Sequence, residues 1–103
     1  MTTPATAFKV LTAQQWTDFE RERVFRGAPV DIADGYIHLS TAEQLEATIE
    51  KYFAGQRGLM IAEVDLLLLG DAVRWEPARG GDLFPHIYAE LPIHAVVSLQ
   101  RRD

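Results

Sequence analysis

The chain has 103 residues, 48% of them apolar and 24% charged, values that are ordinary for a globular protein. We expect one domain over residues 1–103, with residues 1–7 as a flexible tail. Fifteen acidic against ten basic residues give a net charge of −5, which argues against nucleic acid as a partner. The chain has no cysteine, so disulfides, thiolate catalysis and cysteine-type zinc sites are excluded.

The sequence contains nothing that predicts contact with a membrane. The first ten residues lack the apolar segment of a signal peptide, and the longest apolar run, residues 66–69, is too short to span a bilayer. We therefore expect a cytoplasmic protein without a membrane partner.

The first predicted elements are a strand and a helix. Residues 8–12 alternate between apolar and polar side chains, as in a half-buried strand. Thr12 and Gln15 have the spacing of a capping box, so a helix should begin there. We expect this helix to continue to about Phe25 and to end before Pro29.

A loop over residues 30–35 and a strand over residues 36–40 follow in the prediction. Alternation places the two aliphatic side chains of this strand on the core face, and Tyr36, His38 and Ser40 on the other face. His38 is therefore expected to point toward a cleft or toward solvent.

A second helix should follow over residues 41–53, with Leu45, Ile49, Tyr52 and Phe53 forming its apolar stripe. The rest of the chain predicts strands, at residues 58–66, 72–77, 84–91 and 93–100. This order of elements predicts an α+β fold with two helices in the N-terminal half and a mainly antiparallel sheet.

Two histidines stand out as candidates for chemistry because each precedes a hydroxyl residue by two positions. His38 and Ser40 in "HLS", and His86 and Tyr88 in "HIY", should each share one face of a strand. Imidazole and hydroxyl groups both donate and accept hydrogen bonds near neutral pH, so such pairs suit a sugar hydroxyl, a phosphate or an amide. In the alternative interpretation, each histidine only holds a loop through its backbone. The third histidine, His94, is assigned a structural or exposed place.

Other side chains near "GGDLFPHIYAELP" leave two interpretations open. The aromatic residues form either a ligand-binding wall or part of the core: Tyr36, Trp75, Phe84 and Tyr88. Arg74 and Arg79 either meet a phosphate or are solvated. Glu90 is expected on the same strand face as His86 and Tyr88. No residue pattern for a metal site is present.

Three motifs in register, "DGYIHLSTAEQL", "VRWEP" and "GGDLFPHIY", resemble the family called domain of unknown function 952. The resemblance spans residues 8–99, nearly the whole chain. It implies a fold similar to the ADP-ribosyltransferase superfamily, with split antiparallel sheets around a cleft that holds NAD in active members.

The resemblance also implies roles for particular residues. His38 and His86 would be the catalytic histidines of the cleft, Tyr88 the stacking or hydroxyl-donating residue, and NAD or a related nucleotide the ligand. Some relatives carry histidine where Lys9 stands, and relatives often replace Glu90, so the histidines rather than a glutamate would carry the chemistry. Ser40, Trp75 and Phe84 complete the expected ligand-binding set.

Two functions of different classes follow from these observations. The first is an enzyme of the ADP-ribosyl-transfer type that acts on a small nucleotide through His38 and His86. The second is a non-catalytic module that keeps the fold and binds a ligand or a protein, a reading that the lysine at position 9 favours.

Overall fold

The protein is built from antiparallel sheets with helices packed against them. The computed structural model describes residues 3–103, apart from the side chain of Arg79. Strands of the first sheet lie in the order β1-β4-β8, those of the second in the order β3-β6-β5, and β2 pairs with β7. The strands are β1 (Thr6–Leu11), β2 (Val24–Phe25), β3 (Ile37–His38), β4 (Leu59–Asp65), β5 (Val73–Pro77), β6 (Leu83–Ile87), β7 (Leu91–Pro92) and β8 (Val96–Arg102). The α-helices are α1 (Ala13–Glu22), α2 (Pro29–Asp34) and α3 (Leu45–Phe53), and the 3-10 segments are η1 (Leu67–Ala72), η2 (Arg79–Gly81) and η3 (Ile93–Ala95).

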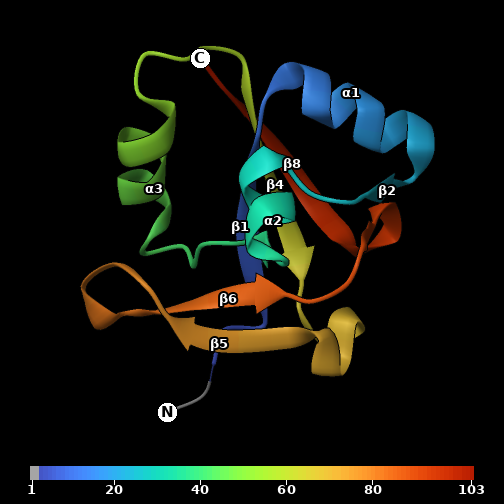
Figure 1. Ribbon diagram of the computed structural model, residues 1–103. Coiled ribbons are helices and arrows are strands. Elements are labelled where there is room, and N and C mark those ends of the chain that lie inside the picture. Colours follow the sequence, from blue (N-terminus) through green and yellow to red (C-terminus); the bar gives the residue numbers. More distant parts are fainter. Residues whose placement is uncertain (1–2) are drawn as a thin grey trace.

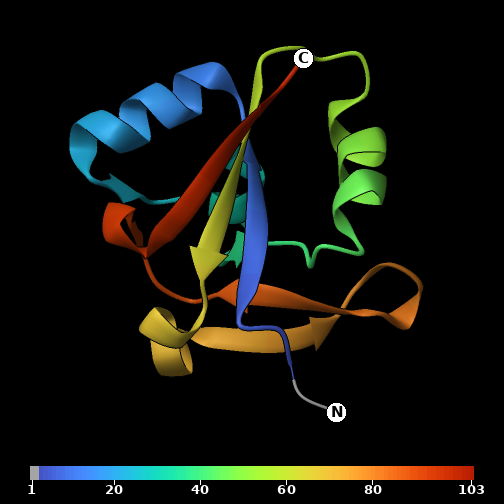
Figure 2. The ribbon, with the colours of Figure 1, turned by 180° about the vertical axis from the view of Figure 1, so that it is seen from behind.

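The two larger sheets run crosswise to each other. Figures 1 and 2 show β5 and β6 passing one end of the β1-β4-β8 sheet, with α1 and α3 on opposite sides of that sheet. A larger apolar cluster joins Phe19 of α1 to the inner faces of both sheets, and a smaller one joins α3 to the other face of the first sheet. The predicted α+β class and the antiparallel pairing are confirmed.

The first helix begins as expected but ends early. Thr12 accepts a hydrogen bond from the Gln15 backbone at 3.1 Å, and the Gln15 side chain accepts one from the Thr12 backbone at 2.9 Å. The predicted end near Phe25 is wrong, because Arg23 adopts the left-handed conformation, with φ of 67°, and donates its N–H to the Phe19 carbonyl. Such a residue closes a helix whatever the apolar pattern beyond it.

The predicted loop over residues 30–35 is wrong as well, because α2 occupies this segment. Pro29 stands in the first turn of α2, where its missing N–H costs nothing, so it begins a helix and does not end the previous one. The fold therefore has three α-helices in its N-terminal half within residues 3–103, and the two that were expected are α1 and α3.

The six predicted strands correspond to β1, β3, β4, β5, β6 and β8 with shifted ends, whereas the short strands β2 and β7 were not predicted. β1 includes Thr6 and Ala7, which were expected in the tail, while the first two residues of that tail lie outside the described part. Regular pairing of β3 covers only residues 37–38, although Ser40 makes a further bridge with Phe8. Tyr52 is 56% exposed and so does not belong to the buried stripe of α3.

Candidate functional site

The register of the β3-β6-β5 sheet brings the two predicted histidines together. His38 on β3 pairs directly with His86 on β6, and their ring centroids are 5.4 Å apart. The alternate residues Ile37, Ile87 and Trp75 face the main core, so the histidines occupy the opposite face of the sheet. Both histidines thus share one face, which the sequence alone did not establish.

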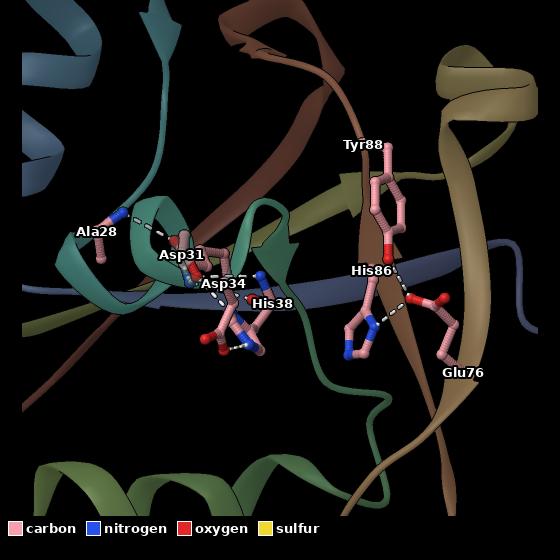
Figure 3. A network of polar contacts seen from close by, with 8 residues as sticks. Ala28, Asp31, Asp34, His38, Glu76, His86 and Tyr88 are labelled. Carbon is pink, nitrogen blue, oxygen red and sulfur yellow. Dashed lines mark hydrogen bonds and ion pairs between the residues drawn. The ribbon is translucent and has the colours of Figure 1, made fainter.

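His38 has a carboxylate at each ring nitrogen. Nδ1 lies 2.6 Å from Oδ1 of Asp31, and Nε2 lies 2.9 Å from Oδ2 of Asp34 (Figure 3). A carboxylate only accepts hydrogen bonds, so both contacts are filled when both ring nitrogens carry a proton. This arrangement leaves His38 without a free nitrogen while the Asp34 contact is closed.

Asp31 connects His38 to a buried lysine. We call these connected residues the His38 network: Lys9, Asp31, Asp34 and His38. The Asp31 side chain is 1% exposed and accepts hydrogen bonds from the Ala28 and His38 backbones, in addition to the contact with the His38 ring. The chain reaches this position through Gly27, where a Cβ atom would lie 2.9 Å from the Cβ of Asp31 and φ is +128°. Only glycine fits there without strain.

Lys9 supplies the charge that balances Asp31. Its Nζ lies 3.0 Å from Oδ2 of Asp31 and donates to the His38 carbonyl at 3.0 Å. Burial lowers the pKa of Lys9, although the neighbouring Asp31 opposes this. Burial alone would raise the pKa of Asp31, but the hydrogen bond from His38 and the charge of Lys9 outweigh it and hold that pKa at about 2. Asp31 is therefore a permanent anion in the folded protein.

His86 belongs to a second group, the His86 network: Glu76, His86 and Tyr88. The Nδ1 atom of His86 lies 2.7 Å from Oε1 of Glu76, and the Tyr88 hydroxyl donates to the same oxygen at 2.7 Å (Figure 3). Glu76 thereby fixes the tautomer in which Nδ1 carries the proton. The hydrogen bonds from Tyr88 and His86 lower the pKa of Glu76, so it is the anionic partner of both groups.

The Nε2 atom of His86 is left available. His86 as a whole is only 3% exposed, and Nε2 makes no hydrogen bond to the part of the chain that the structure describes. Within that part, no buried side-chain nitrogen or oxygen lacks a partner, so Nε2 must reach solvent. Its lone pair can accept a proton, and the Glu76 carboxylate would stabilise the resulting imidazolium.

Tyr36 covers the ring of His86. The two rings stack with centroids 4.1 Å apart and an interplanar angle of 28°, and Tyr36 also contacts His38 and Tyr88. Burial, and then the charges of Asp34 and Glu76, raise the pKa of the Tyr36 phenol, so it stays neutral and acts as an aromatic cover. This ring shields His86 while Nε2 stays open.

Several predicted ligand-binding residues lie elsewhere. Ser40 is buried, and its hydroxyl contacts Thr48 at 2.8 Å, so it does not stand beside the His38 ring. Trp75 packs against the main core on the other face of the sheet. Phe84 shares the strand face of His86 but is only 7% exposed. Of the predicted ligand-binding residues, Tyr88 is the one that both belongs to the His86 network and reaches solvent, at 39% exposure.

The expected position of Glu90 is wrong. β6 ends at Ile87, so Glu90 does not continue its alternation, and its carboxylate pairs with Arg26 at 2.8 Å. The carboxylates that contact the two histidines come from residues that sequence reasoning missed: Asp31, Asp34 and Glu76. Pro29 followed by Asp31 is a helix-start signal that could have revealed α2. Glu76 gave no such signal, because only the β5–β6 register brings it to His86.

A shallow hollow of about 350 Å³ borders Asp31 of the His38 network. Its walls include the side chains of Tyr36, Ile87 and Ile32, with the Arg26–Glu90 ion pair at its edge. Among residues 3–103, no cluster of three or more metal-ligating side chains is present. None of the helices in that part of the chain is long and apolar enough to cross a membrane, and the expected cytoplasmic location stays a prediction.

Fold and site together define a small α+β domain with two histidine–carboxylate networks on one sheet face. Comparison with protein families places it more narrowly: residues 10–99 match the family described as "Protein of unknown function (DUF952)", so the chain belongs to that family. The predicted resemblance to this family is therefore confirmed, while the likeness to ADP-ribosyltransferases stays a prediction. Among curated proteins, none matches the chain.

Solved structures support the same grouping. The crystal structure of protein CC0527 from Caulobacter crescentus is 38% identical, with a TM-score of 0.92, over 95% of this chain and 86% of that chain. Its solution NMR structure is 37% identical, with a TM-score of 0.83, over 94% and 84% of the two chains. The description of that protein names no activity, so these likenesses support the fold and the family.

Proposed function

We propose that the chain is an acid–base catalyst of the ADP-ribosyl-transfer type, which acts on NAD or a related nucleotide through His86. One observation carries the proposal: His86 has one ring nitrogen held by Glu76, while the other forms no hydrogen bond to the described part of the chain and is not fully buried. That is the arrangement of a general base whose proton uptake is supported by a carboxylate. The relation to ADP-ribosyltransferases rests on the sequence resemblance, since the likenesses to solved structures carry no activity.

In the proposed reaction, Nε2 of His86 takes the proton of an attacking water or hydroxyl group. The oxygen of that group bonds to the ribose carbon as the bond to the nicotinamide nitrogen breaks. The bonding electron pair leaves with nicotinamide, whose positive charge it neutralises. Glu76 stabilises the imidazolium that forms on His86.

His38 has a different role in this proposal. With both ring nitrogens facing carboxylates, it is a donor of hydrogen bonds and not a base. The Asp34 side chain is 45% exposed, so its contact with Nε2 can open without disturbing the core. His38 would then bind a ribose hydroxyl through Nε2, while Asp31 keeps the ring in place.

A second candidate function is a non-catalytic binding module. The Lys9 side chain favours it, because Lys9 is buried against Asp31 and cannot take the ligand-anchoring place of a histidine. Such a module would bind a nucleotide at the same sheet face without turnover.

The test combines nicotinamide release from NAD with the melting temperature in the presence of NAD and of ADP-ribose. We expect both ligands to raise the melting temperature of the wild type, His86→Ala to abolish that rise, and His86→Asn to abolish nicotinamide release. His94→Asn is the matched control, since His94 is exposed and lies outside both networks, and it should behave as the wild type. Ligand-induced stabilisation without release would support the binding module, and no stabilisation by either ligand would contradict both functions.

A further inference from the structure

Arg74 stands across from His86 on the flank away from His38. The β5–β6 register pairs Arg74 with His86, and His38 pairs with His86 from the other side. The guanidinium of Arg74 lies over the ring of Tyr88, 4.6 Å from its centroid. Stacking of this kind holds the group in place, so less side-chain entropy is lost when a ligand binds to it.

The hydrogen-bond donors of Arg74 are unused. A guanidinium has five N–H donors, and within residues 3–103 Arg74 forms neither an ion pair nor a hydrogen bond. Other arginines do pair with carboxylates there: Arg21, Arg26, Arg101 and Arg102. Glu76 is two residues away, but its Oε1 accepts from Tyr88 and His86 instead. Arg74 is thus an exposed, positioned cation that interacts electrostatically with the nearby Glu76 carboxylate but forms no ion pair with it within residues 3–103.

We propose that Arg74, stacked on Tyr88, is an anion subsite that binds the phosphate groups of the ligand. This inference rests on the proposed function, because the ligand is the nucleotide on which His86 acts. A guanidinium binds phosphate through two parallel N–H donors, a geometry that suits a diphosphate. The ligand is therefore one that carries phosphate and not a bare nucleoside.

Charge across the sheet face sets the orientation of that ligand. Asp34 lies on the β3 flank and would repel an anion, whereas Arg74 lies on the β5 flank. Phosphate groups therefore lie over Tyr88, and the sugar hydroxyls lie toward His38 and Asp34. The Glu76 carboxylate also lies on the β5 flank and weakens the attraction, so we expect Arg74 to contribute about tenfold in affinity.

The experiment measures binding of inorganic pyrophosphate, ADP and adenosine by calorimetry. The variants are Arg74→Gln and Arg74→Lys. Arg57→Gln is the matched control, because it makes the same charge change at an exposed arginine in the segment between α3 and β4. We expect Arg74→Gln to weaken pyrophosphate and ADP about tenfold and to leave adenosine unchanged. Arg74→Lys should recover part of the loss, and Arg57→Gln should show none.

The outcomes separate this inference from the proposed function. Equal weakening by Arg74→Gln and Arg57→Gln would overturn the subsite, as would equal weakening of ADP and adenosine, or no pyrophosphate binding to the wild type. Arg74-dependent pyrophosphate binding without nicotinamide release would support the subsite and contradict the catalytic role of His86. Nicotinamide release that Arg74→Gln leaves unchanged would support the enzyme and overturn the subsite.

Discussion

The two histidines lie on the same sheet face but differ in how many of their ring nitrogens have a hydrogen-bond partner. Both ring nitrogens of His38 contact carboxylates, and the network behind it ends at a buried pair between Lys9 and Asp31. His86 has one nitrogen held by Glu76 and the other open, and its network lies near the surface. Both ring nitrogens are thus paired in the His38 network, whereas one ring nitrogen has no partner in the His86 network.

This difference shows that the partners of a histidine decide which of its ring nitrogens can contact a ligand. A carboxylate at each nitrogen consumes both donors of His38, whereas the single carboxylate at His86 orients the ring and leaves one lone pair. The following predictions test whether the His38 network is mainly structural and the His86 network mainly functional.

The largest effect should come from Asp31. Replacing it with alanine leaves the ammonium of Lys9 buried without a counter-charge, and we expect a loss of about 3–5 kcal/mol in the free energy of unfolding. Urea denaturation measures this loss. Asp18→Ala, which breaks an exposed pair with Arg21, is the control and should cost less than about 1 kcal/mol.

A double variant distinguishes the cost of an unpaired buried charge from the cost of lost packing. In Asp31→Leu combined with Lys9→Met, no buried charge is left unpaired, so the double variant should be more stable than Asp31→Ala alone. If Asp31→Ala were as stable as Asp18→Ala, the His38 network would not be a structural element and the comparison would fail.

The pH dependence of stability should also reflect Asp31. Its pKa is about 2 in the folded protein against 3.8 as the ordinary value, a difference that corresponds to about 2 kcal/mol. Because the folded pKa is the lower one, this stabilisation is complete above pH 3.8 and is lost as the pH falls through about 2. Urea denaturation at a series of acidic pH values should show the loss in this window, and a flat stability across it would contradict the assignment.

A smaller effect concerns access to His86. Removing the ring that stacks on it, by Tyr36→Ala, should speed modification of His86 by diethylpyrocarbonate several-fold. Tyr52→Ala removes an exposed aromatic ring from α3 and should leave the rate unchanged. Mass spectrometry identifies the modified residue, and faster modification of His38 than of His86 in the wild type would reverse the comparison.

The smallest expected effect is on the Tyr88 phenol. Its hydrogen bond to Glu76 raises its pKa, with burial and the Glu76 charge adding to the shift. Glu76→Gln should therefore lower the pKa of Tyr88 toward the ordinary 10.0, which ultraviolet titration of the phenolate can follow. Tyr88→Phe identifies the signal, and an unchanged titration in Glu76→Gln would show that the His86 network does not form in solution.

Much of the fold could be predicted from local patterns. The Thr12 capping box and the aliphatic runs of β4 and β5 are local signals, and each lies where the sequence indicated. α2 was missed because a six-residue helix carries little periodicity and because Pro29 is equally compatible with a helix start and a loop.

The site was only half predictable, for a physical reason. Strand alternation predicted which face of its strand each histidine occupies. That His38 and His86 lie opposite each other depends on the β3–β6 register, which no local pattern encodes. The carboxylates that contact the two histidines come from α2, a helix that was not predicted, and from β5, whose register with β6 no local pattern encodes. Ser40 is buried, and Trp75 packs against the core, one of the two places that the sequence left open for its aromatic residues.

Long-range proton–nitrogen NMR spectra of the two histidines test most directly whether their ring nitrogens are paired differently, because these spectra show which of the four nitrogens carry a proton. The account predicts that Nδ1 of both histidines carries a proton, donated to Asp31 by His38 and to Glu76 by His86, and that the Nε2 of His86 has no hydrogen-bond partner in the protein. A proton on Nε2 of a neutral His86, with Nδ1 bare, would contradict the account, because Glu76 would then neither orient the ring nor leave a base facing the ligand.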